Sequence, residues 1–445
     1  MNTPPFPHWL TKSVNGRLRW MLIGWTFMVS AVAYLDRVNV SIAGQAIQKH
    51  HGLNDMQLGW VFSAFLIGYA LFQVPGGWLA DRFGPRLVIS AGVVWWGLFT
   101  SLTALVPTGL TASLALLIST RFILGIGEAV LFPSSNKLVS AWIPSSERGL
   151  ANGLIFAGVG AGAGVTPPLI IYILSRWGWQ WSFFVSAGIG LAVGVVWLFL
   201  VRDTPRTHPL ASATEVEKIE AGMPLATQGH ERPLPWSAIL SSRNVWAVTV
   251  SYFSYCYVTY IFFTWFFIYL SRVRGLDLKS SALYSMLPFI AMVCGALLGG
   301  WVADRITRDY SKRLGRCGVA IFGLVLAAMF LSVATQVESA RVASIVLAGG
   351  AGAIYLAQSA FWSVTADIAG KSAGTVSGLM NMGGQVGGAV TASLTPWIAE
   401  RFGWTASFLV AAGFCLAASL AWLLVNPEKP ISLHRPAHER GWIER

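Results

Sequence analysis

Four charged residues lie inside long apolar stretches of this 445-residue sequence, namely Asp36, Arg37, Arg121 and Glu128. A charge at the centre of a helix in a bilayer costs roughly 2.5–3.5 kcal/mol, so four such charges indicate a function. A carboxyl group can take up and release a proton, whereas a guanidinium group stays charged and grips a carboxylate through two hydrogen bonds. We therefore expect proton transfer at Asp36 and Glu128 and anion binding at Arg37. The alternative is a static ion-pair network that fixes helix packing.

The spacing of these residues predicts their arrangement. Arg121 and Glu128 are seven residues apart, nearly two helical turns, so they share one stripe of a helix and lie about 10 Å apart. Asp36 is expected at the depth of Arg121, which predicts an ion pair between them, and a proton on Asp36 would release Arg121. Arg37 points roughly 100° away from Asp36, toward a central cavity. None of the 7 histidines lies in an apolar stretch, so proton coupling is assigned to Asp36, Glu128 and Arg121.

The composition identifies the elements that must position these residues. The sequence is 55% hydrophobic and only 11% charged, whereas soluble domains carry roughly 25% charged residues. Twelve apolar runs are close to the ~20 residues that cross a bilayer, and in hydrocarbon such runs form helices. The sequence therefore predicts an all-α membrane protein with twelve transmembrane helices, over residues 20–47, 57–80, 87–106, 112–135, 149–175, 181–201, 244–270, 282–303, 317–336, 342–364, 373–398 and 404–425.

The basic residues gather on one side of the predicted membrane. Of the 31 Lys and Arg residues, 22 fall on the side of the N-terminus and 7 on the other side. Because loops rich in Lys and Arg stay in the cytoplasm, both termini are predicted to be cytoplasmic, in a multi-pass protein of the inner membrane. The net charge of +12 is spread over short loops at helix ends, which argues against binding to nucleic acid.

The two halves of the chain contain related sequences at an offset near 225 residues. Gly-Gly-Trp-Leu-Ala-Asp-Arg at residues 76–82 recurs with one change at residues 299–305. An even number of helices per half gives both halves the same orientation, so the repeat is parallel. We expect a six-helix lobe over residues 1–201, a polar cytoplasmic linker over 202–243, a second six-helix lobe over 244–426 and a cytoplasmic tail over 427–445.

The repeated motif predicts a conformational latch between helices. Glycines allow two helices to approach closely, and an Asp at the membrane edge can pair with a neighbouring helix end or with an Arg. An ordinary charged turn is the alternative, which the presence of two copies disfavours. The residues assigned to the latch are Gly77, Asp81, Arg82, Arg86, Asp304 and Arg305.

Two sets of motifs resemble known families. Residues 77–86, Gly-Trp-Leu-Ala-Asp-Arg-Phe-Gly-Pro-Arg, resemble the signature of the major facilitator superfamily between its second and third helices. Residues 34–39, Tyr-Leu-Asp-Arg-Val-Asn, together with Arg121, Glu128-Ala129 and Phe132-Pro133, are similar to the anion:cation symporter family. That family contains sugar-acid/H⁺ symporters and aromatic-carboxylate permeases. The resemblance implies the major facilitator fold, anion contact at Arg37 and proton coupling at Asp36 and Glu128.

Polar and aromatic residues within the predicted spans are candidates for the substrate site, and the resemblance places Tyr69 and Asn381 at positions that face the substrate. A single free Arg in the cavity favours a monovalent organic anion. The stretch 157–161 lacks the hydrogen-bonding side chain typical of sugar-acid members, which favours aromatic carboxylates, whereas the tyrosines and amides favour sugar acids. Both classes stay open. The assigned substrate-binding residues are Arg37, Tyr69, Gln73, Tyr257, Tyr260, Trp362, Asn381 and Gln385.

Together these features predict a proton-coupled symporter for an organic monocarboxylate, which works as a monomer by alternating access. Its partners are the anion, protons and the lipid bilayer, and it needs no metal or cofactor beyond the proton gradient. An anion exchanger or uniporter is the nearest alternative, and a sensor or scaffold that has lost transport is another. A membrane enzyme is disfavoured because the spans contain no His and no cluster of metal ligands.

Overall fold

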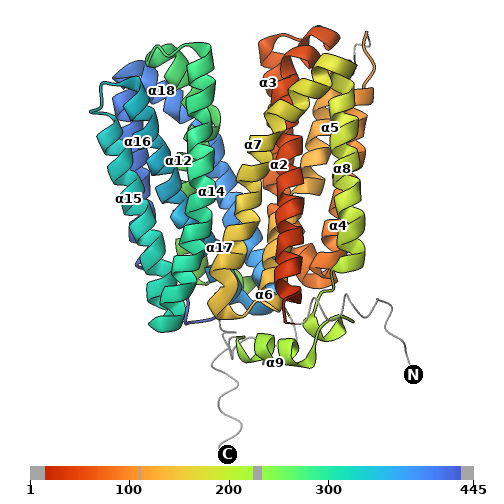
Figure 1. The fold of residues 1–445 in the computed structure, drawn as a ribbon, viewed down its shortest axis with the longest axis vertical. Coiled ribbons are helices and arrows are strands. Elements are labelled where there is room, and N and C mark those ends of the chain that lie inside the picture. Colours follow the sequence, from red (N-terminus) through yellow and green to blue (C-terminus); the bar gives the residue numbers. More distant parts are fainter. Residues whose placement is uncertain (1–15, 110–111, 224–232, 432–445) are drawn as a thin grey trace, which may run out of the picture.

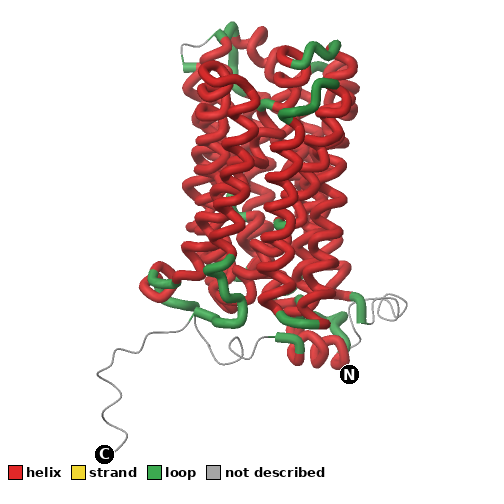
Figure 2. The backbone as a smooth tube through the Cα atoms, turned by 90° about the vertical axis from the view of Figure 1, so that its left-hand side faces the viewer, coloured by secondary structure: helices red, strands yellow, loops and turns green. Residues whose placement is uncertain are grey.

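The computed structural model describes residues 16–109, 112–223 and 233–431, which form a bundle of long helices without a strand (Figures 1 and 2). The middle of the predicted linker, residues 224–232, and most of the predicted tail, residues 432–445, lie outside the described ranges.

The N-terminal half consists of long helices with defined ends. Asn54 begins α3 with a capping box, in which its side chain accepts from the backbone N–H of Gln57. Gly178, with φ 90°, separates α7 from α8. The helices of this half are α2 (Leu18–His51), α3 (Asp55–Phe83), α4 (Pro85–Leu105), α5 (Ser113–Glu128), α6 (Leu131–Trp142), α7 (Arg148–Trp177) and α8 (Trp179–Leu200), with a short 3₁₀ turn η1 (Ser145–Glu147) before α7.

The C-terminal half has the same kinds of element. The helices are α12 (Arg243–Thr264), α13 (Phe266–Ile268), α14 (Leu278–Asp309), α15 (Val319–Ala334), α16 (Ala340–Leu356), α17 (Gln358–Ala369) and α18 (Ala373–Trp422), and the short elements η3 (Tyr269–Val273), η4 (Leu314–Gly318) and η5 (Gly370–Ser372) lie between them. Gly403, with φ 83° and ψ 163°, interrupts α18 because this backbone conformation is not helical. Gly403 stands 225 residues after Gly178, which has nearly the same conformation.

Ten helical stretches of the described residues are long and apolar enough to cross a membrane. The last stretch covers 83 residues, 340–422, which is far longer than the ~20 residues that one crossing needs. It contains the predicted spans 342–364 and 373–398 and most of the predicted span 404–425. The chain is therefore an all-helical, multi-pass membrane protein.

The two halves pack together at one end of the bundle. They meet near α6, α17 and the linker helix α9 (Ala213–Ala221) and diverge toward the opposite end (Figure 1). We call these the linker end and the far end. The pairs α3 with α18 and α7 with α14 pack across the boundary. A side chain on Gly77 would clash with the carbonyl oxygen of Gly374, and one on Gly300 with that of Gly149, so glycine is required at both crossings.

The described first part of the linker is fixed to the N-terminal half. The buried Glu215 carboxylate of α9 accepts hydrogen bonds from the backbone N–H groups of Leu18 and Arg19, at 3.4 and 3.2 Å, and so caps the start of α2. The Arg19 guanidinium also donates to Glu215, at 3.2 Å. At the end of α9, the carbonyl of Gly222 accepts from the N–H of Ser145 at 2.9 Å.

Candidate functional site

A buried ion pair occupies the centre of the N-terminal half. The Arg37 Nε of α2 lies 2.5 Å from the Glu128 Oε1 of α5, and the two side chains are 12% and 1% exposed. The Arg37 guanidinium lies 4.1 Å from the ring centroid of Tyr69 and 4.8 Å from that of Tyr34. Its buried Nη2 donates to no described group. The pair therefore offsets two buried charges and leaves one guanidinium nitrogen available to a ligand.

The predicted pair between Asp36 and Arg121 is not formed in this conformation, and Arg37, expected to be free, has the carboxylate partner instead. Both oxygens of the buried Asp36 have no hydrogen-bond partner among the described residues. The guanidinium of Arg121 lies over the ring of Phe65, 5.0 Å from its centroid, and its Nε has no acceptor. The difference arises because Arg37 reaches across to Glu128 on α5, while Arg121 turns toward α3.

A cavity next to the ion pair lies between the two halves and is lined by residues of both. Its wider part, of about 330 Å³, is lined by Arg37, Arg121 and the aromatic rings of Tyr34, Phe65 and Phe263. A narrower part of about 40 Å³ adjoins it, and Tyr34, Tyr260 and Phe263 line both. The predicted substrate residues that line one or both parts are Arg37, Tyr69, Tyr260, Trp362, Asn381 and Gln385.

Tyr257, predicted as a substrate residue, lies outside this cavity. Its ring stacks on Phe414 with 4.2 Å between centroids, and its hydroxyl lies 3.2 Å from the Thr395 Oγ1. The residues of α12 that line the cavity, such as Tyr252 and Thr259, occupy an arc of the helix that excludes position 257. Tyr257 therefore packs α12 against α18.

Gln73 lies behind the cavity wall and does not line it. Its side chain is fully buried, and its Oε1 accepts a hydrogen bond from the Asn381 Nδ2 at 2.7 Å. The Asn381 Oδ1 accepts in turn from the Gln385 Nε2 at 3.3 Å, and the Gln385 Oε1 accepts from the Tyr260 hydroxyl at 2.8 Å. Gln73 thus contacts the site through Asn381.

The assigned residues did not include several aromatic and polar side chains of the cavity wall. Tyr34 stands one helical turn before Arg37, and Phe132 stands one turn after Glu128, so helical spacing could have identified both. The remaining side chains of the wall come mainly from α12 and α17. These additional lining residues are Tyr34, Phe132, Phe156, Tyr252, Tyr255, Thr259, Phe263, Tyr355 and Gln358.

Asp81 connects the halves at the linker end. Its carboxylate accepts from the backbone N–H groups of Gly374 and Thr375 at the start of α18, at 3.0 and 2.6 Å, and from the Thr375 hydroxyl at 2.6 Å. The Lys137 Nζ lies 3.3 Å from Asp81. A carboxylate at a helix N-terminus is stabilised by the helix dipole and by unpaired N–H groups. The contact requires the two halves to be together at this end.

Asp304 makes the corresponding contact in the other direction. Its carboxylate accepts from the backbone N–H groups of Gly149 and Leu150 at the start of α7, at 2.8 and 2.6 Å. Arg316 donates to Asp304 at 2.8 Å. Each half therefore contributes one Asp to a helix start of the other half.

Among the described residues, the polar and ring contacts of three basic residues assigned to the latch stay within their own half. Arg82 is exposed and lies over the ring of Trp78 on its own helix, and Arg305 pairs with Asp309, also on its own helix, at 2.7 Å. The Arg86 guanidinium donates to a backbone carbonyl at the end of α8. Helix periodicity explains the difference for Arg82 and Arg305, which follow Asp81 and Asp304 and so point away from the crossing, whereas Arg86 lies on the next helix, α4.

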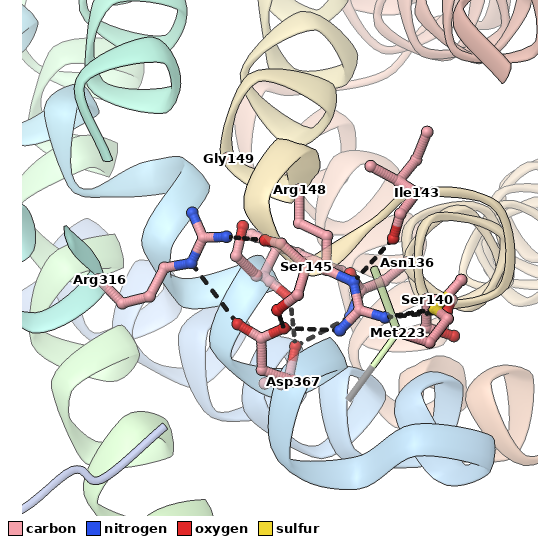
Figure 3. A network of polar contacts seen from close by, with 12 residues as sticks. Asn136, Ser140, Ile143, Ser145, Arg148, Gly149, Met223, Arg316 and Asp367 are labelled. Carbon is pink, nitrogen blue, oxygen red and sulfur yellow. Dashed lines mark hydrogen bonds and ion pairs between the residues drawn. The ribbon is translucent and has the colours of Figure 1, made fainter. Parts of the chain in front are cut away.

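A buried charge network, which the sequence did not predict, extends the Asp304 contact (Figure 3). Asp367 of α17 lies 2.6 Å from the Arg148 Nη1 and 3.5 Å from the Arg316 Nε, and accepts from the Ser145 hydroxyl at 2.8 Å. All three charged side chains are fully buried. Arg316 also donates to the carbonyl of Ser145 at 2.6 Å, so Ser145 of the N-terminal half is bonded to two residues of the C-terminal half.

The linker contributes a titratable group, His208, whose ring packs edge-on against Trp142 of α6. The His208 Nε2 lies 2.8 Å from the carbonyl of Leu200, and its Nδ1 accepts from the N–H of Leu210 at 3.1 Å. Burial lowers the pKa of His208, the Leu200 carbonyl opposes this effect, and the charge of Arg202 lowers the pKa further. A neutral ring with its proton on Nε2 satisfies both hydrogen bonds. Among the described residues, no group of three or more His, Cys, Asp or Glu is arranged to hold a metal ion.

Comparison with known proteins finds relatives along most of the chain. Residues 26–392 and 310–444 match the Major Facilitator Superfamily. A probable sulfoacetate transporter of Cupriavidus necator is 36% identical over 413 residues, which cover 92% of this chain and 94% of that protein. A probable galactarate/D-glucarate transporter of Bacillus subtilis is 30% identical over 94% of each chain. The D-galactonate transporter of Escherichia coli O6:H1 is 29% identical over 92% of this chain and 96% of its own length.

A solved structure supports the fold. The proton:xylose symporter XylE bound to 6-bromo-6-deoxy-D-glucose matches with a TM-score of 0.75 at 15% identity, over 94% of this chain and 98% of that one. The named relatives are transporters, which agrees with the prediction that the chain is not an enzyme. The predicted fold family is confirmed. Since the family match covers most of the sequence and a relative shares 36% identity over almost its full length, the chain belongs to the Major Facilitator Superfamily.

Proposed function

We propose that this protein is a secondary transporter that takes up an organic monocarboxylate together with a proton, by alternating access of two six-helix lobes. The observation that carries the proposal is the buried pair of Arg37 and Glu128 at the wall of an aromatic cavity, next to the unpaired carboxyl of Asp36. This arrangement combines one anion-binding group with two carboxyl groups that can hold a proton.

Anion binding is assigned to Arg37. Its Nη2 is buried with no acceptor among the described residues, and the guanidinium lies against the rings of Tyr69 and Tyr34. A substrate carboxylate would gain charge-assisted hydrogen bonds from the Arg37 guanidinium. It would then compete with the Glu128 carboxylate for that guanidinium. Asn381 and Gln385, both from the C-terminal half, supply amide groups to the narrower part of the cavity.

Proton coupling is assigned to Glu128 and Asp36, with Arg121 as the neighbouring cation. When the substrate carboxylate takes Arg37, Glu128 loses its partner, and a buried carboxylate without a partner is costly unless it takes up a proton. Proton uptake and anion uptake therefore favour each other. Asp36, whose oxygens have no partner, is the second carboxyl group in the proton path.

The lobes are residues 1–201 and 244–426, joined by the linker 202–243 and followed by the tail 427–445. Asp81 contacts the start of α18, and Asp304 contacts the start of α7. Both contacts belong to a conformation that is closed at the linker end, and Gly77 permits the close crossing of the helices. The distribution of Lys and Arg makes the linker end cytoplasmic in the inner membrane. The conformation is then outward-facing, and a monomer suffices because the site lies within one chain. No cofactor is assigned, since the proton gradient supplies the energy.

The substrate class is narrowed by the names of the relatives and by the cavity. The relatives are named for sulfoacetate, galactarate/D-glucarate and D-galactonate, all small organic anions. Aromatic rings dominate the cavity wall, which suits a flat or compact carboxylate, and the two amides suit hydroxyl groups. We therefore keep sugar acids and aromatic carboxylates as the two classes to be tested.

Uptake by purified protein in liposomes tests the proposal. D-Galactonate, sulfoacetate and benzoate are offered with and without an inward proton gradient, and a protonophore collapses the gradient. We expect at least one anion to accumulate only with the gradient. Arg37→Gln should weaken anion binding roughly tenfold to a hundredfold, because a charge-assisted contact is lost. Arg206→Gln, the same change at an exposed position of the linker, should have no effect.

Two other outcomes would identify the alternatives. Counterflow that does not respond to the proton gradient would make the protein an exchanger or uniporter. If neither binding nor transport of any of the three anions occurs, the symport proposal fails for these classes, and the sensor or scaffold alternative gains support.

A further inference from the structure

We propose that Gln73 is a positioning residue that couples occupancy of the cavity to contact between the two halves. It does so through its hydrogen bond to Asn381, which we call the clasp. This inference rests on the proposed transport function, but the contact itself is a property of the structure. The clasp joins α3 of the N-terminal half to α18 of the C-terminal half, at 2.7 Å between the Gln73 Oε1 and the Asn381 Nδ2.

The clasp fixes how Asn381 faces the cavity. The Asn381 amide is held at both ends, by Gln73 at its nitrogen and by Gln385 at its oxygen. One N–H of the Asn381 amide is used by Gln73, which leaves the second N–H as a donor for a ligand. Gln73 is fully buried and is not part of the cavity lining, so it acts on a ligand only through Asn381.

Among the described side chains, the clasp has no counterpart at the corresponding crossing of α14 and α7. At one crossing a side chain on Gly378 would clash with the backbone carbonyl of Gln73, and at the other a side chain on Gly153 would clash with that of Ala296. The two crossings have the same backbone contact at the sequence offset of the repeat. Phe156 stands 225 residues before Asn381, so the second crossing offers Ala296 and Phe156 where the first has the hydrogen-bonded amides.

This asymmetry indicates a specific task, because close packing alone is achieved at both crossings. The backbones of α3 and α18 touch at Gly378, so the two helices cannot separate at this level without breaking the clasp. The clasp therefore exists only while the linker end is closed. A ligand that draws Asn381 toward the cavity weakens the clasp and favours separation of the halves at the linker end.

The test replaces Gln73 by Met, which keeps the volume and removes the hydrogen bond. Spin labels at Tyr172→Cys on α7 and Leu283→Cys on α14, both exposed near the far end, report the distance between the halves. The exposed Cys294 is replaced by Ser to avoid labelling it. Binding of D-galactonate, sulfoacetate and benzoate to wild-type protein is measured first, by tryptophan fluorescence. The anion that binds is then used as the ligand in the distance measurements.

Asn152→Leu is the matched control. Its Nδ2 donates to the Ser363 Oγ across the same boundary at 3.3 Å, but neither residue lines the cavity. In the wild type, ligand should raise the fraction of short far-end distances. In Gln73→Met that fraction should be raised about fivefold without ligand and should change less than twofold when ligand is added. Asn152→Leu should keep the ligand response.

Three results would overturn the inference. One is a ligand-free distance distribution of Gln73→Met identical to the wild type. Another is a loss of binding as large as that of Arg37→Gln, which would make Gln73 an ordinary ligand contact. The third is an equal loss of ligand response in Asn152→Leu. If wild-type protein binds none of the three anions, the proposed function fails for them, and the ligand-free comparison still decides whether the clasp holds the halves together.

Discussion

Glu128 holds the guanidinium of Arg37 against the cavity, with 2.5 Å between the Oε1 and the Nε and with 91 residues between the two positions in the chain. The Arg37 guanidinium is at the same time stacked on Tyr69. An anion that binds the Arg37 guanidinium therefore competes with the Glu128 carboxylate for the same positive charge, and under the proposed mechanism Glu128 takes up a proton when the anion binds.

Replacing Glu128 by Gln should separate anion binding from proton coupling. The neutral amide no longer competes for Arg37, so anion binding should be unchanged or tighter at neutral pH, while accumulation driven by a proton gradient should be lost. Binding is measured by tryptophan fluorescence and accumulation in liposomes. Glu217→Gln, an exposed change on α9, is the control. Gradient-driven accumulation that persists in Glu128→Gln would remove Glu128 from the proton path.

Replacing Asp367 by Asn should destabilise the closed linker end. Asp367 neutralises two fully buried guanidinium groups, and breaking a buried pair costs about 3–5 kcal/mol. We expect a melting temperature several degrees lower and more molecules with short far-end distances. Asp309→Asn removes an exposed pair with Arg305, worth about 0–1 kcal/mol, and should melt like the wild type. Equal melting of the two variants would contradict the structural role of the network.

A methyl group on Gly77 should prevent the linker end from closing. Its Cβ would clash with the carbonyl of Gly374, a backbone atom that cannot move aside without displacing α18. Spin-label distances should shift toward short far-end values, and transport should fall at least tenfold. Gly188→Ala, where a Cβ meets no atom within 4 Å, should leave both unchanged. A wild-type distance distribution in Gly77→Ala would show that the crossing tolerates a side chain.

The docking of the linker should depend on pH through His208. Because burial holds the pKa of His208 below its usual value of 6.5, the folded linker favours the neutral ring. The stabilisation is complete above pH 6.5 and is lost as the pH falls through 6.5 toward the lowered pKa, since protonated Nδ1 can no longer accept from Leu210. Hydrogen exchange at the Leu210 amide should therefore accelerate at pH 5.5 relative to pH 8, after correction for intrinsic rates. This acceleration at low pH should be absent in His208→Gln. If the wild-type protein shows no acceleration between pH 8 and pH 5.5, His208 does not control the docking of the linker.

The sequence predicts the membrane class and the main features of the site because these depend on local properties. A bilayer requires long apolar helices, so stretches of about 20 apolar residues identify them, and a charge within such a stretch stands out, as Asp36 and Glu128 do. The repeated Gly-Gly-Trp motif likewise marks two crossings where α3 and α14 contact the other half. Helix periodicity places residues three or four positions apart on one face of a helix, as with Gln358 and Trp362 of α17, which both line the cavity.

Only the tertiary structure decided which groups meet. Whether Asp36 or Arg37 faces α5 depends on the rotation of α2 within the bundle, and the prediction of an Asp36 pair failed on this point. The same holds for Tyr257, which packs on Phe414, and for Arg148 and Asp367, which pair across 219 residues of sequence. The physical reason is that an apolar pattern along one helix sets its burial, whereas partners across helices are set by crossing geometry and close backbone contact.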